Sequence, residues 1–289
     1  MIIVSCHNLA FVSRQRGSKC HSNIYNMPKS SADDKILSYN DVVLRQSDLG
    51  ILNGPYYLND RLIEFYFSYL SSSHPSEHIL LVPPSIAFWI MNCPDISSLK
   101  DFLQPLNLPS KNLIIFPVNN NNDMTAVEGG SHWSLLAFEK TTNVFVHHDS
   151  YGGMNKSHAK RLYKTLLPFL GVSGTRYMEC DCSPQQVTGY DCGLYVLAIA
   201  KEICDWFESN LRKDEGLWFT QVVERVTPKR ISGFRVEILE LITSLRGSKI
   251  GIDAWTMVGG GGGGGCGGQW WVVVDGGGGV VDDDGGGGE

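Results

Sequence analysis

Several signatures of common protein classes are missing from this chain. It has no run of about 18 apolar residues, so the sequence predicts no membrane span. It also lacks a dense cluster of Lys and Arg, and its net charge of −6 argues against a nucleic-acid partner. Its 8 cysteines are scattered and include no Cys-x-x-Cys pair, which excludes a zinc ribbon and indicates a reducing compartment.

The composition changes sharply at both ends of the 289 residues. Residues 1–32 contain no Asp or Glu, which fits a transit peptide or a disordered or wrongly assigned start that precedes Met27. Residues 251–289 are Gly-rich and bury too little surface to offset their ordering entropy. We therefore predict an N-terminal extension at 1–32, one folded domain at 33–250, and a disordered tail at 251–289. The protein is expected in the cytoplasm or nucleus, with organelle targeting by the extension as the alternative.

Helix and strand signals mix along the folded domain and predict the α+β class. Asn59 is the expected N-cap of a helix over 60–70. Further helices are predicted at 85–92, 97–104, 155–170, 192–208, 217–226 and 229–246. Strands are predicted at 78–82, 113–118, 132–139, 143–149 and 176–180, and the pair 132–139 and 143–149 flanks a short polar break typical of a hairpin.

Three short motifs carry residues capable of chemistry. Gly129–Leu136 (GGSHWSLL) places a His at the start of a strand, and His148–Ser150 (HDS) ends the next strand. Adjacent antiparallel strands bring His132 and Asp149 side by side. The third motif, Gln185–Gly193 (QQVTGYDCG), places a Cys at the start of a helix.

These residue types match the needs of nucleophilic catalysis by a thiolate. An ordinary Cys has a pKa of about 8.5, and a helix N-terminus or a neighbouring imidazolium lowers the pKa of such a thiol. A catalytic His needs a group that holds its tautomer, which Asp149 can supply. The backbone N–H of Cys192 and the side-chain amide of Gln186, a short turn upstream, are candidate donors for an oxyanion. A structural His, a buried inert Cys and an Asp in a turn are the alternative interpretations of each residue taken alone.

Two other groups of residues resemble metal ligands. His147 and His148 are adjacent, but no third ligand stands at a sensible spacing, so we interpret them as strand-end residues. Cys180 and Cys182 also lack a partner pair and are interpreted as structural. No metal and no cofactor are expected, because thiol chemistry needs neither metal nor nucleotide.

Taken together, GGSHWSLL, HHDS and the Gln-x5-Cys motif with YDCGLYV resemble the three catalytic segments of the Ulp-type, sentrin/SUMO-specific cysteine proteases. The resemblance covers about residues 36–246 and is closer to the deneddylase branch, which acts on the Nedd/RUB modifier. LSYNDVVLRQSDLGIL, YLNDRLIEF, FLQPLNLPSKNLIIFPVN and SHAKRL carry this closer similarity. The resemblance implies a papain-like cysteine protease fold of the Ulp type, with a central mixed sheet flanked by helices.

The family resemblance also implies a role for each matching residue. Cys192 is the implied nucleophile, His132 the general base and acid, Asp149 its orienting group, and Gln186 part of the oxyanion hole. The implied substrate-binding residues are Trp133, Tyr57, Asn59 and Asp60. Trp133 roofs a narrow passage that admits only Gly-Gly, because residues with a Cβ clash beneath the ring. Tyr57 stands where the family has Trp, which puts catalytic efficiency in doubt more than reaction type.

The expected function is cleavage after the C-terminal Gly-Gly of a ubiquitin-like modifier, by a thiol-dependent isopeptidase or peptidase. The Nedd/RUB type is the expected modifier, and deconjugation and precursor processing both stay open. A SUMO- or ubiquitin-specific protease of the same mechanism is one alternative. A modifier-binding adaptor with weak catalysis is another. The expected partners are the modifier and its conjugates, with no nucleic acid and no membrane, and a monomer is the default state.

Overall fold

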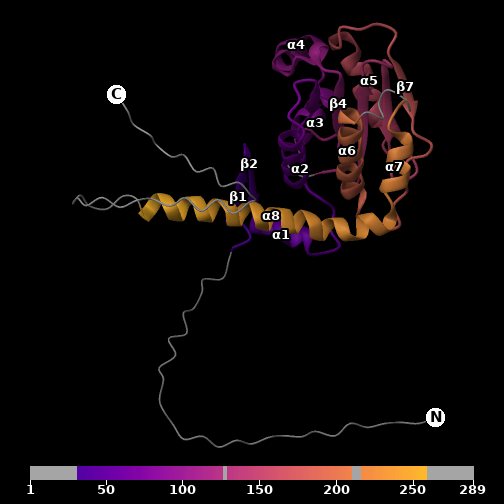
Figure 1. The fold of residues 1–289 in the computed structure, drawn as a ribbon. Helices are drawn as coiled ribbons and strands as arrows, with labels where there is room; N and C mark the ends of the chain where they lie inside the picture. Colours follow the sequence, from indigo (N-terminus) through magenta and orange to yellow (C-terminus); the bar gives the residue numbers. More distant parts are fainter. Residues whose placement is uncertain (1–30, 126–128, 210–215, 259–289) are drawn as a thin grey trace, which may run out of the picture. The chain divides into compact units, whose positions relative to one another are not determined.

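The computed structural model describes residues 31–125, 129–209 and 216–258 (Figure 1). Its contacts divide the chain into two units, Met1–Thr243 and Ser244–Glu289, and the fold below belongs to the first unit. Nearly all of the predicted extension and most of the predicted tail lie outside the described residues. Within the described residues, no helix is long and apolar enough to cross a membrane.

The centre of the first unit is a five-stranded sheet in the order β3-β4-β5-β6-β7. Its strands are β3 Ile79–Leu81, β4 Leu113–Asn119, β5 Trp133–Glu139, β6 Val144–His148 and β7 Arg176–Glu179. The two outer pairs, β3 with β4 and β6 with β7, are parallel, whereas β4, β5 and β6 pair antiparallel. The predicted hairpin and the expected mixed sheet are therefore confirmed, and each predicted strand lies within a residue or two of its position.

The helices also follow the sequence prediction closely. They are α2 Asp60–Ser73, α3 Pro84–Asn92, α4 Ile96–Leu103, α5 Lys156–Leu166, α6 Cys192–Glu208, α7 Phe219–Arg225 and α8 Pro228–Val258. Short 3-10 turns at Gln104–Leu106, Leu108–Ser110 and Leu167–Phe169 supplement them. The predicted cap is confirmed, because the Asn59 side chain accepts the backbone N–H of Leu62 at 3.0 Å. The α+β class is thus confirmed.

The last helix, α8, is longer than predicted. The structure continues it through Val258, past the position where the tail was expected to begin. Adding residues to an existing helix needs no new nucleation, so the segment 247–258 can extend α8 despite its glycines. Residues 259–289 lie outside the described part of the chain.

The sequence analysis missed the first elements of the domain. Strands β1 Lys35–Tyr39 and β2 Val42–Arg45 form an antiparallel hairpin, and α1 Gln46–Leu52 follows at once. The turn between the strands contains Asn40 at φ 47°, a left-handed conformation that Asn tolerates. Asp48 of α1 is fully buried, and its carboxylate accepts hydrogen bonds from Asn59 and Arg61, which ties this segment to the start of α2.

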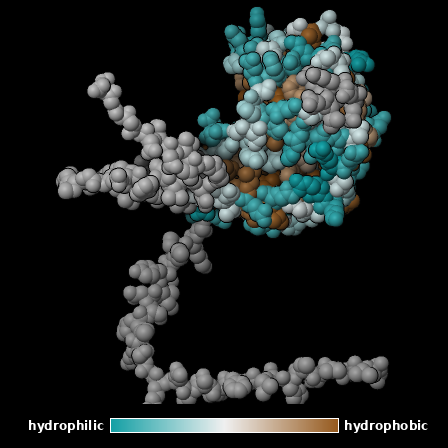
Figure 2. All heavy atoms as spheres, in the orientation of Figure 1, coloured by the Kyte–Doolittle hydropathy of each residue, from teal (hydrophilic) through white to brown (hydrophobic). Residues whose placement is uncertain are grey.

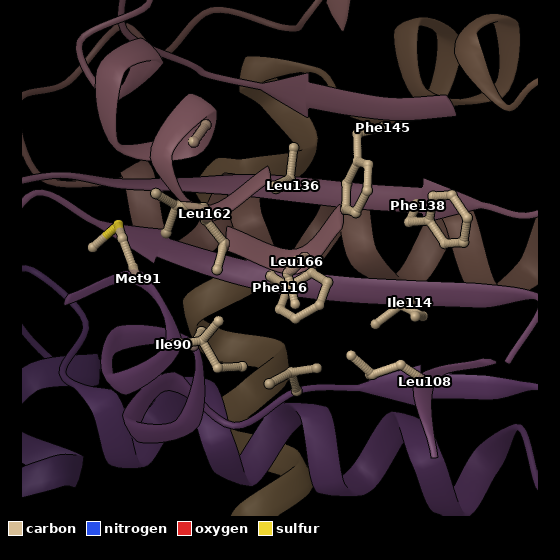
Figure 3. Packing of buried hydrophobic residues seen from close by; sticks show 14 of the residues in the cluster. Ile90, Met91, Leu108, Ile114, Phe116, Leu136, Phe138, Phe145, Leu162 and Leu166 are labelled. Atoms are coloured by element: carbon tan, nitrogen blue, oxygen red, sulfur yellow. The ribbon is translucent and has the colours of Figure 1, made fainter. Parts of the chain in front are cut away.

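One face of the sheet packs against α3 and α5 through a continuous apolar core (Figure 3). Phe116 and Leu136 of the central strands lie in the same buried cluster as Ile90 of α3 and Leu162 and Leu166 of α5. The opposite face contacts α6, whose apolar residues are buried over almost its whole length. Because β4, β5 and β6 are covered on both sides, all their residues are buried and most of them are apolar. Elsewhere the visible surface is mostly hydrophilic, with apolar residues in small groups (Figure 2).

Candidate active site

The hairpin β5–β6 brings His132 and Asp149 together at one end of the sheet. His132 directly precedes β5 and Asp149 directly follows β6, so the two side chains meet across the antiparallel pair. Nε2 of His132 lies 2.7 Å from Oδ1 of Asp149, and both side chains are buried. This bond assigns the Nε2 proton of the ring to the carboxylate and leaves Nδ1 for another partner.

Backbone donors hold the Asp149 carboxylate in place. Its Oδ1 also accepts the N–H of Tyr151 at 2.9 Å, and its Oδ2 accepts the N–H of Asn155 at 2.8 Å. Burial raises the pKa of Asp149, but the hydrogen bonds from His132, Asn155 and Tyr151 outweigh it and lower that pKa below its usual value. The group beside His132 is therefore a fixed anion.

Two asparagines that the sequence analysis did not single out fix the main chain around His132. The side-chain Nδ2 of Asn155 donates to the carbonyl of His132 at 3.2 Å and to that of Val118 at 2.9 Å. Asn120 Oδ1 accepts the backbone N–H groups of Ser131 and His132, at 2.7 Å and 3.1 Å. The Asn-rich loop before the His was visible in the sequence, but which of its amides faces the His depends on the fold.

Cys192 is the first residue of α6 and is fully buried against the His–Asp pair. Burial lowers the pKa of His132, but hydrogen bonds and charge from Asp149 and Cys192 outweigh it and raise that pKa to about 9. At neutral pH the imidazole thus holds its proton, which is the form that stabilises a neighbouring thiolate. The N–H groups of the first turn of α6 have no acceptor within the helix, so they also favour a negative charge on Cys192.

The side-chain amide of Gln186 is held by hydrogen bonds at both its oxygen and its nitrogen. Ser150 Oγ donates to Gln186 Oε1 at 2.8 Å, and Gln186 Nε2 donates to the carbonyl of Thr188 at 2.7 Å. The backbone also connects the two segments, because the N–H of Gln186 donates to the carbonyl of Ser150 at 2.8 Å. An amide nitrogen carries two hydrogens, so one is not used by the bond to Thr188.

The aromatic residues expected at the passage lie on neighbouring segments. Trp133 is buried, and its indole N–H donates to the carbonyl of Leu58 at 3.0 Å. Tyr57, the residue before Leu58, is 49% exposed and so is free to contact a ligand. Tyr151 is half exposed, and its ring centroid lies 6.0 Å from that of His132. Tyr151, which was not predicted, therefore places exposed aromatic surface beside His132.

Asn59 and Asp60 differ in what they offer a ligand. The amide of Asn59 caps α2 with its oxygen and donates from Nδ2 to buried Asp48 at 2.7 Å, so the protein itself uses both ends. Asp60 is exposed at the start of α2. The structure thus gives Asn59 a structural role and leaves the carboxylate of Asp60 at the surface.

The two histidines before Asp149, His147 and His148, are hydrogen-bonded to other residues of the domain. His147 is hydrogen-bonded to Glu179 and to Ser134, and His148 lies between Ser183 and the indole N–H of Trp218. Both therefore have partners within the protein, in keeping with the strand-end interpretation. Among the described residues, no three His, Cys, Asp or Glu side chains gather as a metal site would require.

A Cys at a helix start, a His–Asp pair and an oriented Gln amide define a cysteine peptidase. The chain belongs to the Ulp1 protease family, because residues 56–213 match the family's C-terminal catalytic domain. It is 54% identical to NEDD8-specific protease 1 of Arabidopsis thaliana over 225 residues, which are 78% of this chain and 99% of that protein. It is 35% identical to sentrin-specific protease 8 of Homo sapiens over 218 residues, 74% of this chain and 98% of that protein.

The fold agrees with this assignment. The Ulp1 protease domain solved in complex with Smt3, the yeast ortholog of SUMO, superimposes with a TM-score of 0.55 at 19% identity. The match covers 75% of this chain and 90% of that structure. The expected protease fold of the Ulp type is therefore confirmed, and the enzyme is a cysteine peptidase.

Proposed function

We propose that this enzyme is a deneddylating isopeptidase, which cuts the bond after the C-terminal Gly-Gly of a NEDD8/RUB-type modifier. The observation that carries the proposal is the arrangement of His132 between Asp149 and Cys192, with the amide of Gln186 held beside them. The choice of modifier is supported by the 54% identity to a NEDD8-specific protease along nearly its whole length. Partners of the enzyme are then the modifier and its conjugates.

The geometry supports a two-step acyl transfer. The thiolate of Cys192 attacks the carbonyl of the last Gly, and the oxyanion that forms accepts hydrogen bonds from the Cys192 N–H and from Gln186 Nε2. His132 gives its proton to the departing amine, so the C–N bond breaks and a thioester remains. His132 then takes a proton from water, which attacks the thioester. The C–S bond breaks, the Cys192 thiolate returns beside the protonated His132, and the modifier carboxylate is released.

The segment that carries Tyr57 and Leu58 explains how a Gly-Gly tail is selected. Trp133, the residue after His132, is fixed against this segment by its bond to the Leu58 carbonyl, and we call Trp133 and Tyr57 together the aromatic wall. Two residues without Cβ fit under such a wall, whereas a side chain clashes with it. Tyr57 extends the wall to the surface, where the modifier tail enters.

The test is hydrolysis of C-terminal fluorogenic amides of NEDD8/RUB, ubiquitin and SUMO by the wild type and by Cys192→Ala. Fast release from NEDD8/RUB alone, abolished by the substitution, supports the proposal. Release from SUMO or ubiquitin alone leaves the mechanism in place and overturns the modifier. Binding without release from any of the three points instead to a modifier-binding adaptor.

A further inference from the structure

The guanidinium of Arg235, on α8, joins two segments that are far apart in the sequence. Its Nη2 and Nε atoms donate to Asp191 Oδ1 at 3.0 Å and 3.3 Å. Nη2 also donates to the carbonyl of Tyr56 at 2.7 Å, and Nη1 donates to the carbonyl of Ile51 at 3.1 Å. The guanidinium lies 5.4 Å from the ring centroid of Tyr190, over its face. One side chain thus contacts both the segment before Cys192 and the segment before Tyr57.

Through Asp191, Arg235 is connected to Gln186, the proposed oxyanion donor. Asp191 is the N-cap residue of α6 and the immediate neighbour of Cys192. Its second oxygen, Oδ2, accepts the hydroxyl of Thr188 at 2.6 Å, and the carbonyl of Thr188 accepts the amide of Gln186 at 2.7 Å. A continuous chain of hydrogen bonds therefore runs from Arg235 through Asp191 and Thr188 to Gln186.

Through the carbonyl of Tyr56, Arg235 is also connected to the aromatic residues Tyr57 and Trp133. Tyr56, whose carbonyl Arg235 binds, directly precedes Tyr57. The carbonyl of Leu58, one residue further, accepts the indole N–H of Trp133. Arg235 therefore holds one end of a three-residue stretch and Trp133 holds the other, with the exposed ring of Tyr57 between them.

We propose that Arg235 is a positioning residue, which sets the distance between the aromatic wall at Tyr57 and the Cys192–Gln186 centre. The inference rests on the proposed function, because it assigns to this residue the alignment of the modifier tail over the sulfur. The Arg235–Asp191 pair is shielded from water, with side-chain exposures of 12% and 13%. Solvent ions therefore screen the attraction between the two charges only weakly, and the pair is stable only in a well-defined geometry. Arg is suited to this task because its planar donors bind several acceptors at once, which a single ammonium group cannot do.

Neutralisation is a second consequence of the contact. A lone carboxylate at position 191 would stand next to the sulfur of Cys192 and oppose a negative charge there. Arg235 offsets that charge while Asp191 keeps its favourable place at the N-terminus of α6. The pair thus allows an acidic N-cap beside a thiolate.

The experiment uses the full chain and compares Arg235→Gln and Arg235→Lys with the wild type and with Arg230→Gln. Arg230 is the matched control, because it lies on the same helix and pairs with Glu237 at the surface. Two rates are measured, namely hydrolysis of the NEDD8/RUB fluorogenic amide and alkylation of Cys192 by iodoacetamide, which needs neither the wall nor the oxyanion hole. Thermal unfolding of each variant is recorded beside them.

For Arg235→Gln we expect kcat to fall about 100-fold, as a misplacement of about 1 Å does. The alkylation rate should fall by no more than about threefold, because it responds to the uncompensated charge of Asp191 and not to the misplacement. Arg235→Lys should recover about tenfold, because an ammonium pairs with Asp191 without reaching all the carbonyls. Arg230→Gln should match the wild type. Asp191→Asn and the double variant Arg235→Gln/Asp191→Asn are measured in the same way. The double variant should be no slower than the slower of its two single variants, because both residues act through one pair.

Other outcomes overturn the inference. Equal losses of hydrolysis and alkylation, with a lowered thermal midpoint, assign Arg235 to fold stability alone. An unchanged kcat in Arg235→Gln removes the role altogether. A wild type that cuts a different Gly-Gly modifier overturns only the proposed modifier, and the same comparison is then made with the amide that it cuts.

Discussion

The Nε2 atom of His132 lies 2.7 Å from Oδ1 of Asp149, and the carboxylate is itself held by two backbone N–H groups. The anion does more than orient the ring, because together with Cys192 it raises the pKa of His132 to about 9 against the opposing effect of burial. The imidazolium is therefore the resting form at neutral pH. This relationship makes the pH dependence of the enzyme a test of the site.

Replacing Asp149 by Asn removes the charge that keeps His132 protonated. The pKa of His132 then falls, so the basic limb of kcat/KM against pH, set near pH 9 in the wild type, moves to lower pH. We also expect kcat to drop about 10³–10⁴-fold, because the amide no longer holds the required tautomer. The measurement is a pH–rate profile with the NEDD8/RUB amide.

Glu179→Gln is the control for this substitution. Glu179 accepts from Nδ1 of His147 at 2.7 Å, so the chemical change is the same on a His–carboxylate pair away from the sulfur. Its profile should follow the wild type. A basic limb that stays in place in Asp149→Asn would contradict the assignment of Asp149.

His148 makes the stability of the fold sensitive to acid. Burial, with a smaller contribution from His147, lowers its pKa from 6.5 to about 3, and Trp218 donates to its Nε2 at 2.8 Å. Between these pH values the unfolded chain binds a proton that the folded chain excludes. Stability is therefore lost as pH falls from 6.5 toward 3, by at most about 1.4 kcal/mol per pH unit.

Urea unfolding at a series of pH values from 7 to 4 measures this slope. In His148→Gln the slope should decrease, because Gln does not titrate. His78→Gln is the control, since the His78 side chain is 52% exposed, and its slope should equal that of the wild type. An unchanged slope in His148→Gln would show that another group causes the acid sensitivity.

The sequence predicted the elements whose pattern is local. The strands around His132 and Asp149 are mostly apolar, and α6 follows a clear start at Asp191 and Cys192, so the segments that carry the candidate catalytic residues were visible. The hairpin β1–β2 was missed although Asn40 and Asp41 stand between two strand-like stretches, because its short strands alternate only weakly. The signal available in the sequence was Asn40, because Asn is a residue that tolerates the left-handed conformation found in this turn.

The supporting residues were out of reach for a different reason. Asn155, Thr188 and Arg235 are ordinary polar residues in the sequence, and no spacing rule connects them to the catalytic motifs. Arg235 reaches Tyr56 and Asp191 only because α8 folds back over both segments. Their roles depend on contacts between distant parts of the chain, which a single sequence does not display.

Asn155 offers a direct measure of how much this support contributes. Its Nδ2 binds two buried carbonyls, those of Val118 and His132, whereas its Oδ1 is buried without a partner among the described residues. Asn155→Ala leaves both carbonyls without this donor, at a cost of about 1–3 kcal/mol in the free energy of unfolding. The substitution should also lower kcat, because the His132 backbone loses a fixed contact.

Urea unfolding and hydrolysis of the modifier amide check both effects. Asn122→Ala, in the exposed part of the loop before His132, is the comparison and should change the unfolding free energy by no more than about 0.5 kcal/mol. A loss of the same size at both positions would mean that Asn155 contributes nothing specific.

Tyr57 tests the aromatic wall. Since the ring is 49% exposed and the indole of Trp is larger, Tyr57→Trp should enlarge the contact with the modifier tail. We expect kcat/KM to rise about fivefold, mainly through a lower KM, which corresponds to about 1 kcal/mol of added aromatic contact. Tyr56→Trp, at the adjacent ring, which is 58% exposed, should have no such effect, and a similar gain in both variants would rule out a specific wall at position 57.

Gly193 is the point where α6 meets the segment that carries the wall. A Cβ at this position would lie 2.8 Å from Cβ of Leu58 and 3.1 Å from its Cγ, too close for either atom to stay in place. Gly193→Ala should therefore push Leu58 away and move the carbonyl that binds the indole of Trp133. The overpacking should cost about 1–3 kcal/mol of stability and lower kcat/KM more than about tenfold.

Gly189→Ala is the matched substitution on the loop before Cys192. A Cβ at Gly189 meets no atom within 4 Å, so this variant should keep both the stability and the activity of the wild type. The two variants are compared by thermal unfolding and by hydrolysis of the modifier amide. Loss of activity in both variants would attribute the effect to loop flexibility. Loss in Gly193→Ala alone shows that the close contact between Leu58 and α6 keeps the aromatic wall correctly placed relative to Cys192.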